Sequence, residues 1–268
     1  MPSRWTLLAA AGLLMGSVHA APPQRILSLC TTATDVLCAI GAGERLSAID
    51  EYGTAVPEAS KVPVIVKGSA ISKEEVLARK VDLAFVWWYQ DDAAKLLREL
   101  RVPVERIRCG RAGELPATVR TIGRRVGREV EANRLADQLT VFLRDCPTTP
   151  APDAPRVYLE LYSLSRTMGT ESYLNDLIMF AGGINIAGGA TRSSVLLSQE
   201  ELLVANPSVI LFVRGFATPE AIARRPRLFA LPAVRRGAVV ALDRQWLIAG
   251  SRLPEAVAHL RAAIHKDN

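Results

Sequence analysis

The sequence predicts an α/β fold of two similar lobes with mostly parallel sheets, joined by one long rigid α-helix, with a ligand cleft between the lobes. Three observations support this fold class. Short apolar strands alternate with helices along most of the chain. One amphipathic helix, followed by a proline-rich segment, divides the chain near its middle. The pattern of residues 71–77 also recurs at residues 197–203.

Alternating strands and helices in the first half define an N-terminal lobe, residues 21–127. The predicted strands are residues 25–29, 46–50, 82–87 and 102–108. The predicted helices are residues 34–40, 72–80, 91–100 and 115–126. Helices between successive strands are typical of a parallel sheet.

The bridging helix is predicted within residues 128–147. Its apolar residues recur every three or four positions over residues 129–145, from Ala132 to Leu143. Four prolines between Pro147 and Pro155 then end the helix and mark a boundary.

A C-terminal lobe, residues 148–268, follows. Its predicted strands are residues 156–161, 209–213 and 238–242, and its predicted helices are residues 173–181, 199–204, 219–224 and 254–266.

The repeated segment places one glutamate of each lobe on a helix start. In each copy a serine caps the helix, and the second of two glutamates completes a capping box. The first glutamate of each pair, Glu74 or Glu200, then has no capping role and faces solvent. The alternative interpretation of this repeat is that both segments are ordinary helix N-termini whose similarity has no further meaning.

The N-terminus has the features of a targeting segment. Arg4 precedes an apolar run over residues 5–15, and small residues lead up to Ala20. This run is shorter than the roughly 20 residues of a membrane-spanning helix. We expect residues 1–20 to be a signal peptide cleaved after Ala20, and the mature protein to be periplasmic.

Composition favours a soluble binding protein. With 49% hydrophobic and 22% charged residues, the chain is typical of globular proteins rather than disordered ones. The net charge of +6 is dispersed instead of forming a basic stripe with aromatic residues, so no nucleic-acid partner is expected. We expect a monomer.

The inventory of catalytic residues is small. Of three histidines, His19 falls in the signal peptide, and His259 and His265 fall in the last helix. No phosphate-binding loop and no paired metal-ligand motif occurs, so neither catalytic residues nor a metal site are predicted. A secreted metal-dependent hydrolase or chelatase using Asp35, Glu51 or Asp82 stays an alternative, as does a scaffold that binds only proteins.

The candidate ligand-binding residues follow predicted strands, because ligands of open parallel sheets bind beyond the carboxyl ends of the strands. Every tryptophan outside the signal peptide falls at such an end, and flat apolar rings suit a flat, partly hydrophobic ligand. The candidates are Cys30, Thr31, Thr32, Glu51, Tyr52, Trp87, Trp88, Tyr89, Arg166, Arg214, Trp246 and Arg252.

Four cysteines remain after export, in a compartment that permits disulfides. Cys38 lies on an apolar helix face and is expected to be a buried thiol. Cys30 and Cys109 are expected to project towards the cleft, where they could be buried thiols, form a disulfide or, less favoured, offer sulfur to a metal centre. The pairing of these three and Cys146 cannot be chosen from sequence.

Several segments together resemble the periplasmic substrate-binding proteins of ABC importers for iron complexes and vitamin B12. The segments are residues 25–29 before 32–37, Tyr52 with 56–59, residues 72–83, residues 181–183 with Asn185, residues 198–207, and Trp246 with 251–254. The resemblance is strongest to the cobalamin-binding members. Thr31 and Val81 depart from it, because the family often has proline at both positions.

The resemblance implies a non-enzymatic protein that captures a metal chelate, a corrinoid first, and delivers it to the transmembrane subunits of an ABC importer. It places Tyr52, Trp87 and Trp246 against the corrin, and Glu74 and Glu200 on arginines of the permease. The alternative to this docking role is that the two glutamates are ordinary solvent-exposed charges on helix surfaces.

A ferric siderophore or haem is the second choice of ligand. Arginines near the predicted cleft, Arg166, Arg214, Arg244 and Arg252, would suit an anionic chelate. Haem would need an axial ligand, for which the cleft offers Tyr52, Tyr89, Tyr162 or a cysteine.

Overall fold

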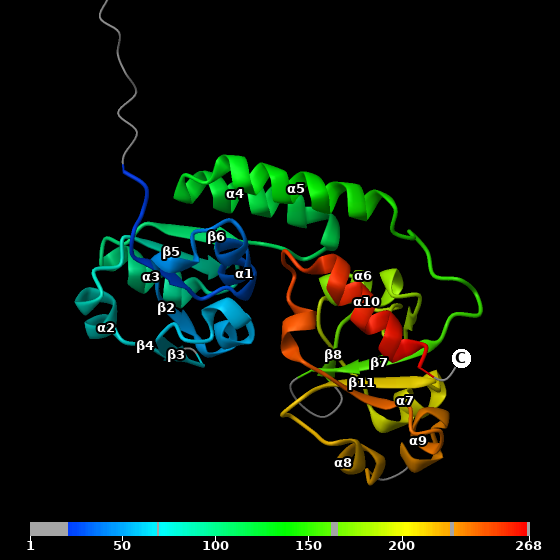
Figure 1. The fold of residues 1–268 in the computed structure, drawn as a ribbon. Helices are drawn as coiled ribbons and strands as arrows, with labels where there is room; N and C mark the ends of the chain where they lie inside the picture. The colour runs from blue at the N-terminus through cyan, green and yellow to red at the C-terminus, as the bar shows by residue number, and fades with distance from the viewer. Residues whose placement is uncertain (1–20, 69, 162–165, 226–227, 267–268) are drawn as a thin grey trace, which may run out of the picture.

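The computed structural model describes residues 21–68, 70–161, 166–225 and 228–266 and consists of two α/β lobes (Figure 1). The signal peptide predicted at residues 1–20 lies outside the described residues. Lobe boundaries at residues 127 and 147 remain a prediction. Among the described residues, no helix combines the length and apolar character that a membrane span requires.

The N-terminal lobe is built on a six-stranded sheet in the order β4-β3-β2-β1-β5-β6. All neighbouring strands are parallel except β3 and β4, which are antiparallel. Its strands are β1 (Ile26–Ser28), β2 (Leu46–Asp50), β3 (Val64–Lys67), β4 (Ala70–Ile71), β5 (Leu83–Trp87) and β6 (Val104–Ile107). The central strands β1 and β5 are buried on both faces, which explains their continuous apolar sequence.

Helices cover both faces of this sheet. Alternate strand residues point to opposite faces, so Ile26 and Phe85 join one core cluster while Leu27 and Ala84 join another. The helices of this part are α1 (Thr31–Ala39), α2 (Lys73–Ala78), α3 (Asp91–Glu99), α4 (Leu115–Val126) and α5 (Glu129–Arg144).

The bridging helix is α5, and it packs against α4 as an antiparallel pair (Figure 1). Gly127 ends α4 in the left-handed conformation, with φ of 65°. Gly123 of α4 lies so close to α5 that a Cβ there would be 2.2 Å from the Cβ of Ala132. The sixteen residues of α5 extend about 24 Å, and the chain leaves its far end for the C-terminal lobe.

The C-terminal lobe has a four-stranded parallel sheet in the order β12-β11-β7-β9 and a separate antiparallel pair, β10-β8. Its strands are β7 (Arg156–Glu160), β8 (Arg166–Thr167), β9 (Ile184–Asn185), β10 (Val195–Leu196), β11 (Val209–Val213) and β12 (Val239–Leu242). Its helices are α6 (Tyr173–Phe180), α7 (Gln199–Ala205), α8 (Pro219–Ala223), α9 (Pro232–Arg235) and α10 (Leu253–Ile264).

Short 3₁₀ helices occupy several of the connections. They are η1 (Gly43–Arg45), η2 (Glu51–Ala55), η3 (Pro57–Ala59), η4 (Ala112–Glu114), η5 (Leu228–Ala230) and η6 (Arg244–Leu247).

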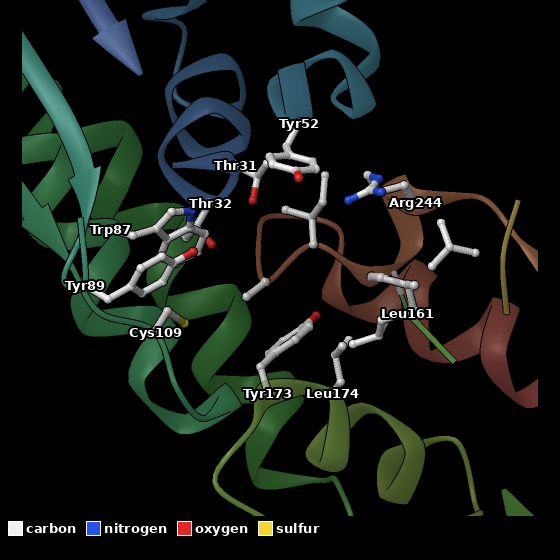
Figure 2. Close-up of a pocket in the computed structure, with 14 residues that line it drawn as sticks. Thr31, Thr32, Tyr52, Trp87, Tyr89, Cys109, Leu161, Tyr173, Leu174 and Arg244 are labelled. Atoms are coloured by element: carbon white, nitrogen blue, oxygen red, sulfur yellow. The ribbon is translucent and has the colours of Figure 1, made fainter. Parts of the chain in front are cut away.

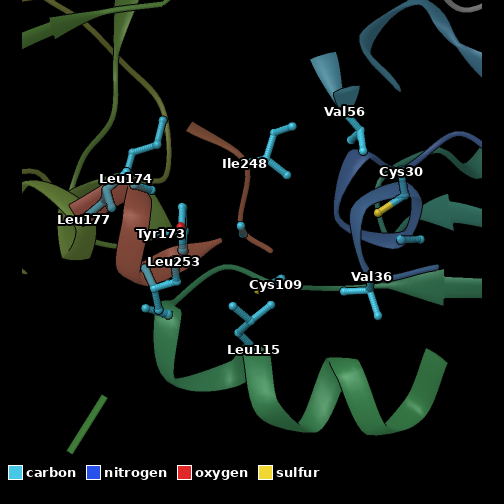
Figure 3. Packing of buried hydrophobic residues seen from close by; sticks show 14 of the residues in the cluster. Cys30, Val36, Val56, Cys109, Leu115, Tyr173, Leu174, Leu177, Ile248 and Leu253 are labelled. Carbon is cyan, nitrogen blue, oxygen red and sulfur yellow. The ribbon is translucent and has the colours of Figure 1, made fainter. Parts of the chain in front are cut away.

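One hydrophobic cluster contains residues of both lobes. Figure 3 shows Val36 of α1, Leu115 of α4 and Leu177 of α6 within it. Polar contacts add to this connection: Arg111 donates through Nε to both carboxylate oxygens of Asp176, at 2.9 Å each. These contacts hold the two lobes in a defined relative position.

A second set of polar contacts joins the lobes near α1. Asp35 of α1 accepts a hydrogen bond from the backbone N–H of Ser251, and Glu58 forms an ion pair with Arg252. Burial raises the pKa of Asp35.

The repeated segment is a capping box in only one of its two copies. In α7, Ser198 and Glu201 form the predicted box. In α2, Ser72 does accept from the Glu75 N–H at 3.1 Å, but the Glu75 carboxylate pairs with Arg79 one helical turn later. The Ser72 hydroxyl donates to Glu74 instead, at 2.9 Å, so the expectation that Glu74 has no role in the cap is wrong.

Candidate functional site

A cavity of about 340 Å³ lies between the two lobes (Figure 2). Its volume falls at the lower end of the range for small-molecule sites. The N-terminal lobe contributes Thr31, Thr32, Tyr52, Trp87, Tyr89 and Cys109, and the C-terminal lobe contributes Leu161, Tyr173, Leu174, Val213, Arg244, Leu247, Ile248 and Ala249.

Parallel strands position the N-terminal wall of the cavity. Thr31 and Thr32 open α1 after a two-residue gap from the end of β1, Tyr52 lies in η2 directly after β2, and Trp87 ends β5. The carboxyl ends of these strands meet at one edge of the sheet, which brings the side chains together.

Trp87 and Tyr89 form an aromatic wall. Their rings are nearly parallel, with an interplanar angle of 8° and centroids 6.2 Å apart. Trp88 meets Tyr89 edge-on, with centroids 4.9 Å apart, and does not line the cavity. Two stacked rings of this kind suit a flat, apolar ligand surface.

Arg244 connects the lobes at the cavity. Its guanidinium lies 5.0 Å from the ring centroid of Tyr52 in the N-terminal lobe and 5.0 Å from that of Phe216 in the C-terminal lobe. Both distances fit cation–π contacts. Arg244 is also the one charged residue that lines the cavity among the residues the structure describes.

Asp50 holds the turn that carries Tyr52. Its carboxylate accepts a hydrogen bond from the Gly53 N–H at 2.8 Å. Burial is the main reason that the pKa of Asp50 is raised to about 6.

Two hydroxyl groups in the cavity wall, on Thr32 and Tyr173, have no hydrogen-bond partner within the described ranges. Thr32 is fully buried, and Tyr173 is 5% exposed. The side chains beside Tyr173 in the C-terminal wall, among them Leu161, Leu174 and Ile248, are apolar.

All four cysteines are free thiols, so the possible Cys30–Cys109 disulfide is not formed. Cys109 lines the cavity, whereas Cys30 is fully buried beside it and lines none of it. Burial raises the pKa of Cys109 to about 12 and that of Cys30 well above its usual value, so both are neutral. Cys38 is partly exposed, and the expectation of a buried thiol there is wrong.

Five of the predicted ligand-binding residues line the cavity: Thr31, Thr32, Tyr52, Trp87 and Tyr89. Seven do not: Cys30, Glu51, Trp88, Arg166, Arg214, Trp246 and Arg252. Tyr162 lies outside the described residues.

The charged residues among these seven face other partners. Arg166 donates to Ser194 at 2.9 Å, and Arg214 pairs with Asp243 at 2.6 Å. Glu51 accepts from the Gly68 N–H at 2.7 Å. Arg252 is occupied by its ion pair with Glu58.

Trp246 requires the largest correction. Its ring stacks on His259 of α10, with centroids 3.8 Å apart and an interplanar angle of 22°. Its neighbours Arg244 and Leu247 line the cavity instead. The indole therefore lies against α10 and not in the wall of this cavity.

Sequence reasoning missed most of the C-terminal wall. Leu161 and Val213 lie at strand ends, so the rule that selected the aromatic residues could have found them. Tyr173 opens a helix, and no strand-end pattern points to it.

The carboxylates considered for a metal-dependent enzyme do not form a common site. Asp35 accepts from Ser251, Glu51 from Gly68, and Asp82 from the backbone of Gln24 and Arg25. Among the described residues, no group of three or more histidine, cysteine, aspartate or glutamate side chains is placed to hold a metal ion.

Glu74 and Glu200 are both exposed, one on α2 and one on α7 (Figure 1). Each lobe therefore presents one of these carboxylates on a helix start.

Comparison with known proteins gives a consistent result. Residues 26–246 match the profile of a family described as periplasmic binding protein. A protein of Vibrio cholerae named vitamin B12-binding protein is 27% identical over 236 residues, which cover 84% of this chain and 83% of that protein.

Two further proteins extend the comparison. An uncharacterized ABC transporter substrate-binding lipoprotein of Bacillus subtilis is 24% identical over 257 residues, covering 91% of this chain and 81% of that protein. A crystal structure of a periplasmic heme binding protein from Pseudomonas aeruginosa superimposes with a TM-score of 0.80 at 21% identity, covering 91% of this chain and 94% of that one.

Proposed function

We propose, from the premise that the chain belongs to the periplasmic binding protein family, that it captures a planar metal chelate between its lobes and delivers it to an ABC importer. Members of this family are substrate-binding proteins of ABC importers and not enzymes. A corrinoid is the first choice of chelate.

The observation that carries this proposal is the stacked pair Trp87 and Tyr89 on one side of the cavity, with the apolar side chains Leu161 and Leu174 on the other. Aromatic rings contribute large apolar contact area with little loss of conformational freedom. A flat macrocycle placed between such walls buries both of its faces.

A corrinoid is favoured by the named function of the Vibrio cholerae relative and by the composition of the cavity. No aspartate or glutamate lines it among the described residues. Peripheral amides of a corrinoid are neutral, and a mostly apolar wall with a few hydroxyl groups accommodates them without burying charge.

Haem is the second candidate, because the cavity is lined by one arginine, Arg244, and by three tyrosines. The Pseudomonas aeruginosa protein, whose fold is similar, is titled a heme binding protein. A ferric siderophore would use the same arginine.

Delivery would depend on Glu74 and Glu200. Exposed carboxylates, one on each lobe, suit reversible and oriented pairing with arginines of a permease. The proposed place of action is the periplasm, after removal of residues 1–20.

Difference absorption titrations with cyanocobalamin, cobinamide, haemin and a ferric hydroxamate test the proposal. We expect a corrinoid to bind at one molecule per chain with a dissociation constant in the micromolar range or below. Haemin binding without corrinoid binding would replace the first choice by the second. Failure of all four would contradict a chelate receptor.

A further inference from the structure

The cavity contains two buried hydroxyl groups that nothing in the described residues satisfies. Thr32 Oγ1 and Tyr173 Oη both lack a hydrogen-bond partner, and both side chains line the cavity. Buried polar groups are nearly always hydrogen-bonded, because burial without a partner costs free energy. Two such groups in one cavity indicate that a ligand supplies their partner.

The two hydroxyl groups come from opposite lobes. Thr32 lies in the first turn of α1, and Tyr173 is the first residue of α6. Figure 2 shows the Tyr173 hydroxyl directed towards the interior of the cavity. A ligand atom that accepts from both groups would therefore connect the two lobes.

The surroundings indicate an acceptor oxygen. Both hydroxyl groups can donate a proton, and the first turn of a helix carries partial positive charge, which favours an acceptor. The apolar neighbours Leu161, Leu174 and Ile248 offer no acceptor of their own from their side chains.

The charge of the surroundings indicates that this oxygen belongs to a neutral group. Burial raises the pKa of Tyr173, and the neighbouring groups Cys109, Asp35 and Asp176 raise it further, in that order. Arg111 is committed to Asp176, and Arg244 lies between Tyr52 and Phe216. A buried carboxylate here would meet negative neighbours and lose its hydration, whereas an amide would not.

We propose that Thr32 and Tyr173 form a subsite for one peripheral carboxamide of a corrinoid and that this subsite discriminates against a carboxylate at the same position. The inference rests on the proposed function, because it names the part of the chelate that this cavity recognises.

The test compares cyanocobalamin with its monocarboxylic acids, in which a single peripheral amide is hydrolysed. Titrations at pH 7.5 use the wild type, Thr32→Val, Tyr173→Phe and the double variant. We expect each single variant to bind cyanocobalamin about tenfold more weakly, with less than a further tenfold loss in the double variant because both groups contact one amide. We expect one monocarboxylic acid isomer to bind the wild type at least tenfold more weakly than cyanocobalamin, and this ratio to shrink in the variants.

The melting temperature of the ligand-free variants distinguishes a role in ligand binding from a role in stabilising the fold. Each substitution removes a hydroxyl that is unpartnered without ligand, so both ligand-free variants should melt at the wild-type temperature or above it. Thr167→Val is the matched control, because Thr167 is also buried and unpartnered in the described ranges but lies outside the cavity. This variant should keep wild-type affinity.

Wild-type affinity for cyanocobalamin in both single variants would overturn the subsite and leave the proposed function intact. Equal affinity of the wild type for cyanocobalamin and every monocarboxylic acid isomer would overturn the discrimination. A wild-type protein that binds haemin but no corrinoid would overturn the proposed corrinoid function, and the subsite with it.

Discussion

Replacing Trp87 or Trp246 with alanine compares a tryptophan that lines the cavity with one that does not. Both pack against the same hydrophobic cluster, but Trp87 lines the cavity and stacks with Tyr89, whereas Trp246 stacks on His259 and lines none of the cavity. Both substitutions replace an indole side chain by a methyl group. The two variants should therefore differ in affinity and stability only because the two rings have different contacts.

Loss of the Trp87 ring should weaken ligand binding by roughly 1–3 kcal/mol, the usual range for an aromatic residue at a binding site. Since about 1.4 kcal/mol corresponds to a tenfold change, the dissociation constant should rise roughly 5- to 140-fold. Trp246→Ala should instead lower the free energy of unfolding by about 2 kcal/mol, below the range for a fully buried tryptophan because its ring is only partly buried.

Affinity is measured by difference absorption with the tightest chelate, and the free energy of unfolding by urea titration of the ligand-free proteins. We expect Trp246→Ala to change the dissociation constant less than twofold. An equal loss of affinity in the two variants would refute the placement of the binding surface.

Three further predictions follow from buried or exposed carboxylates. Burial raises the pKa of Asp50 from 3.8 to about 6, so its stabilising contribution is complete below about pH 4 and is lost as the pH rises through 6. Urea titrations should show up to about 3 kcal/mol of this pH dependence in the wild type and not in Asp50→Asn, and an unchanged pH profile would count against it. Asp176→Asn should lower the free energy of unfolding by about 2 kcal/mol, less than for a fully buried pair because its partner Arg111 is half exposed, and urea titration at neutral pH would detect it. Combined replacement of Glu74 and Glu200 by alanine should leave chelate affinity unchanged but abolish stimulation of the importer's ATPase in vesicles, and full stimulation would contradict the docking role.

The sequence predicts those helices and strands whose residue pattern is complete within a short segment of the chain. The apolar runs of β5 and β11 and the periodicity of α5 follow from residues close in sequence, and the strand-end rule correctly placed Trp87 and Tyr52 at the cavity. The short strands of two residues, such as β4 and β8, contain too few positions for any periodicity to be detected.

The remainder depends on contacts between residues far apart in the chain. The strand-end rule places the backbone near Trp246 but does not say that η6 turns the indole onto His259. Arg214 and Arg252 were expected to face the ligand, yet each is engaged by an acidic residue that sequence alone does not bring near it. Side-chain direction and long-range pairing therefore limited the prediction of the site.

A crystal structure of the protein with its tightest-binding chelate tests the central claim most directly. We predict one macrocycle between the lobes, with one face against Trp87 and Tyr89 and its opposite face towards Leu161 and Leu174. A macrocycle bound to an outer surface of either lobe, with these four side chains free of it, would contradict the account.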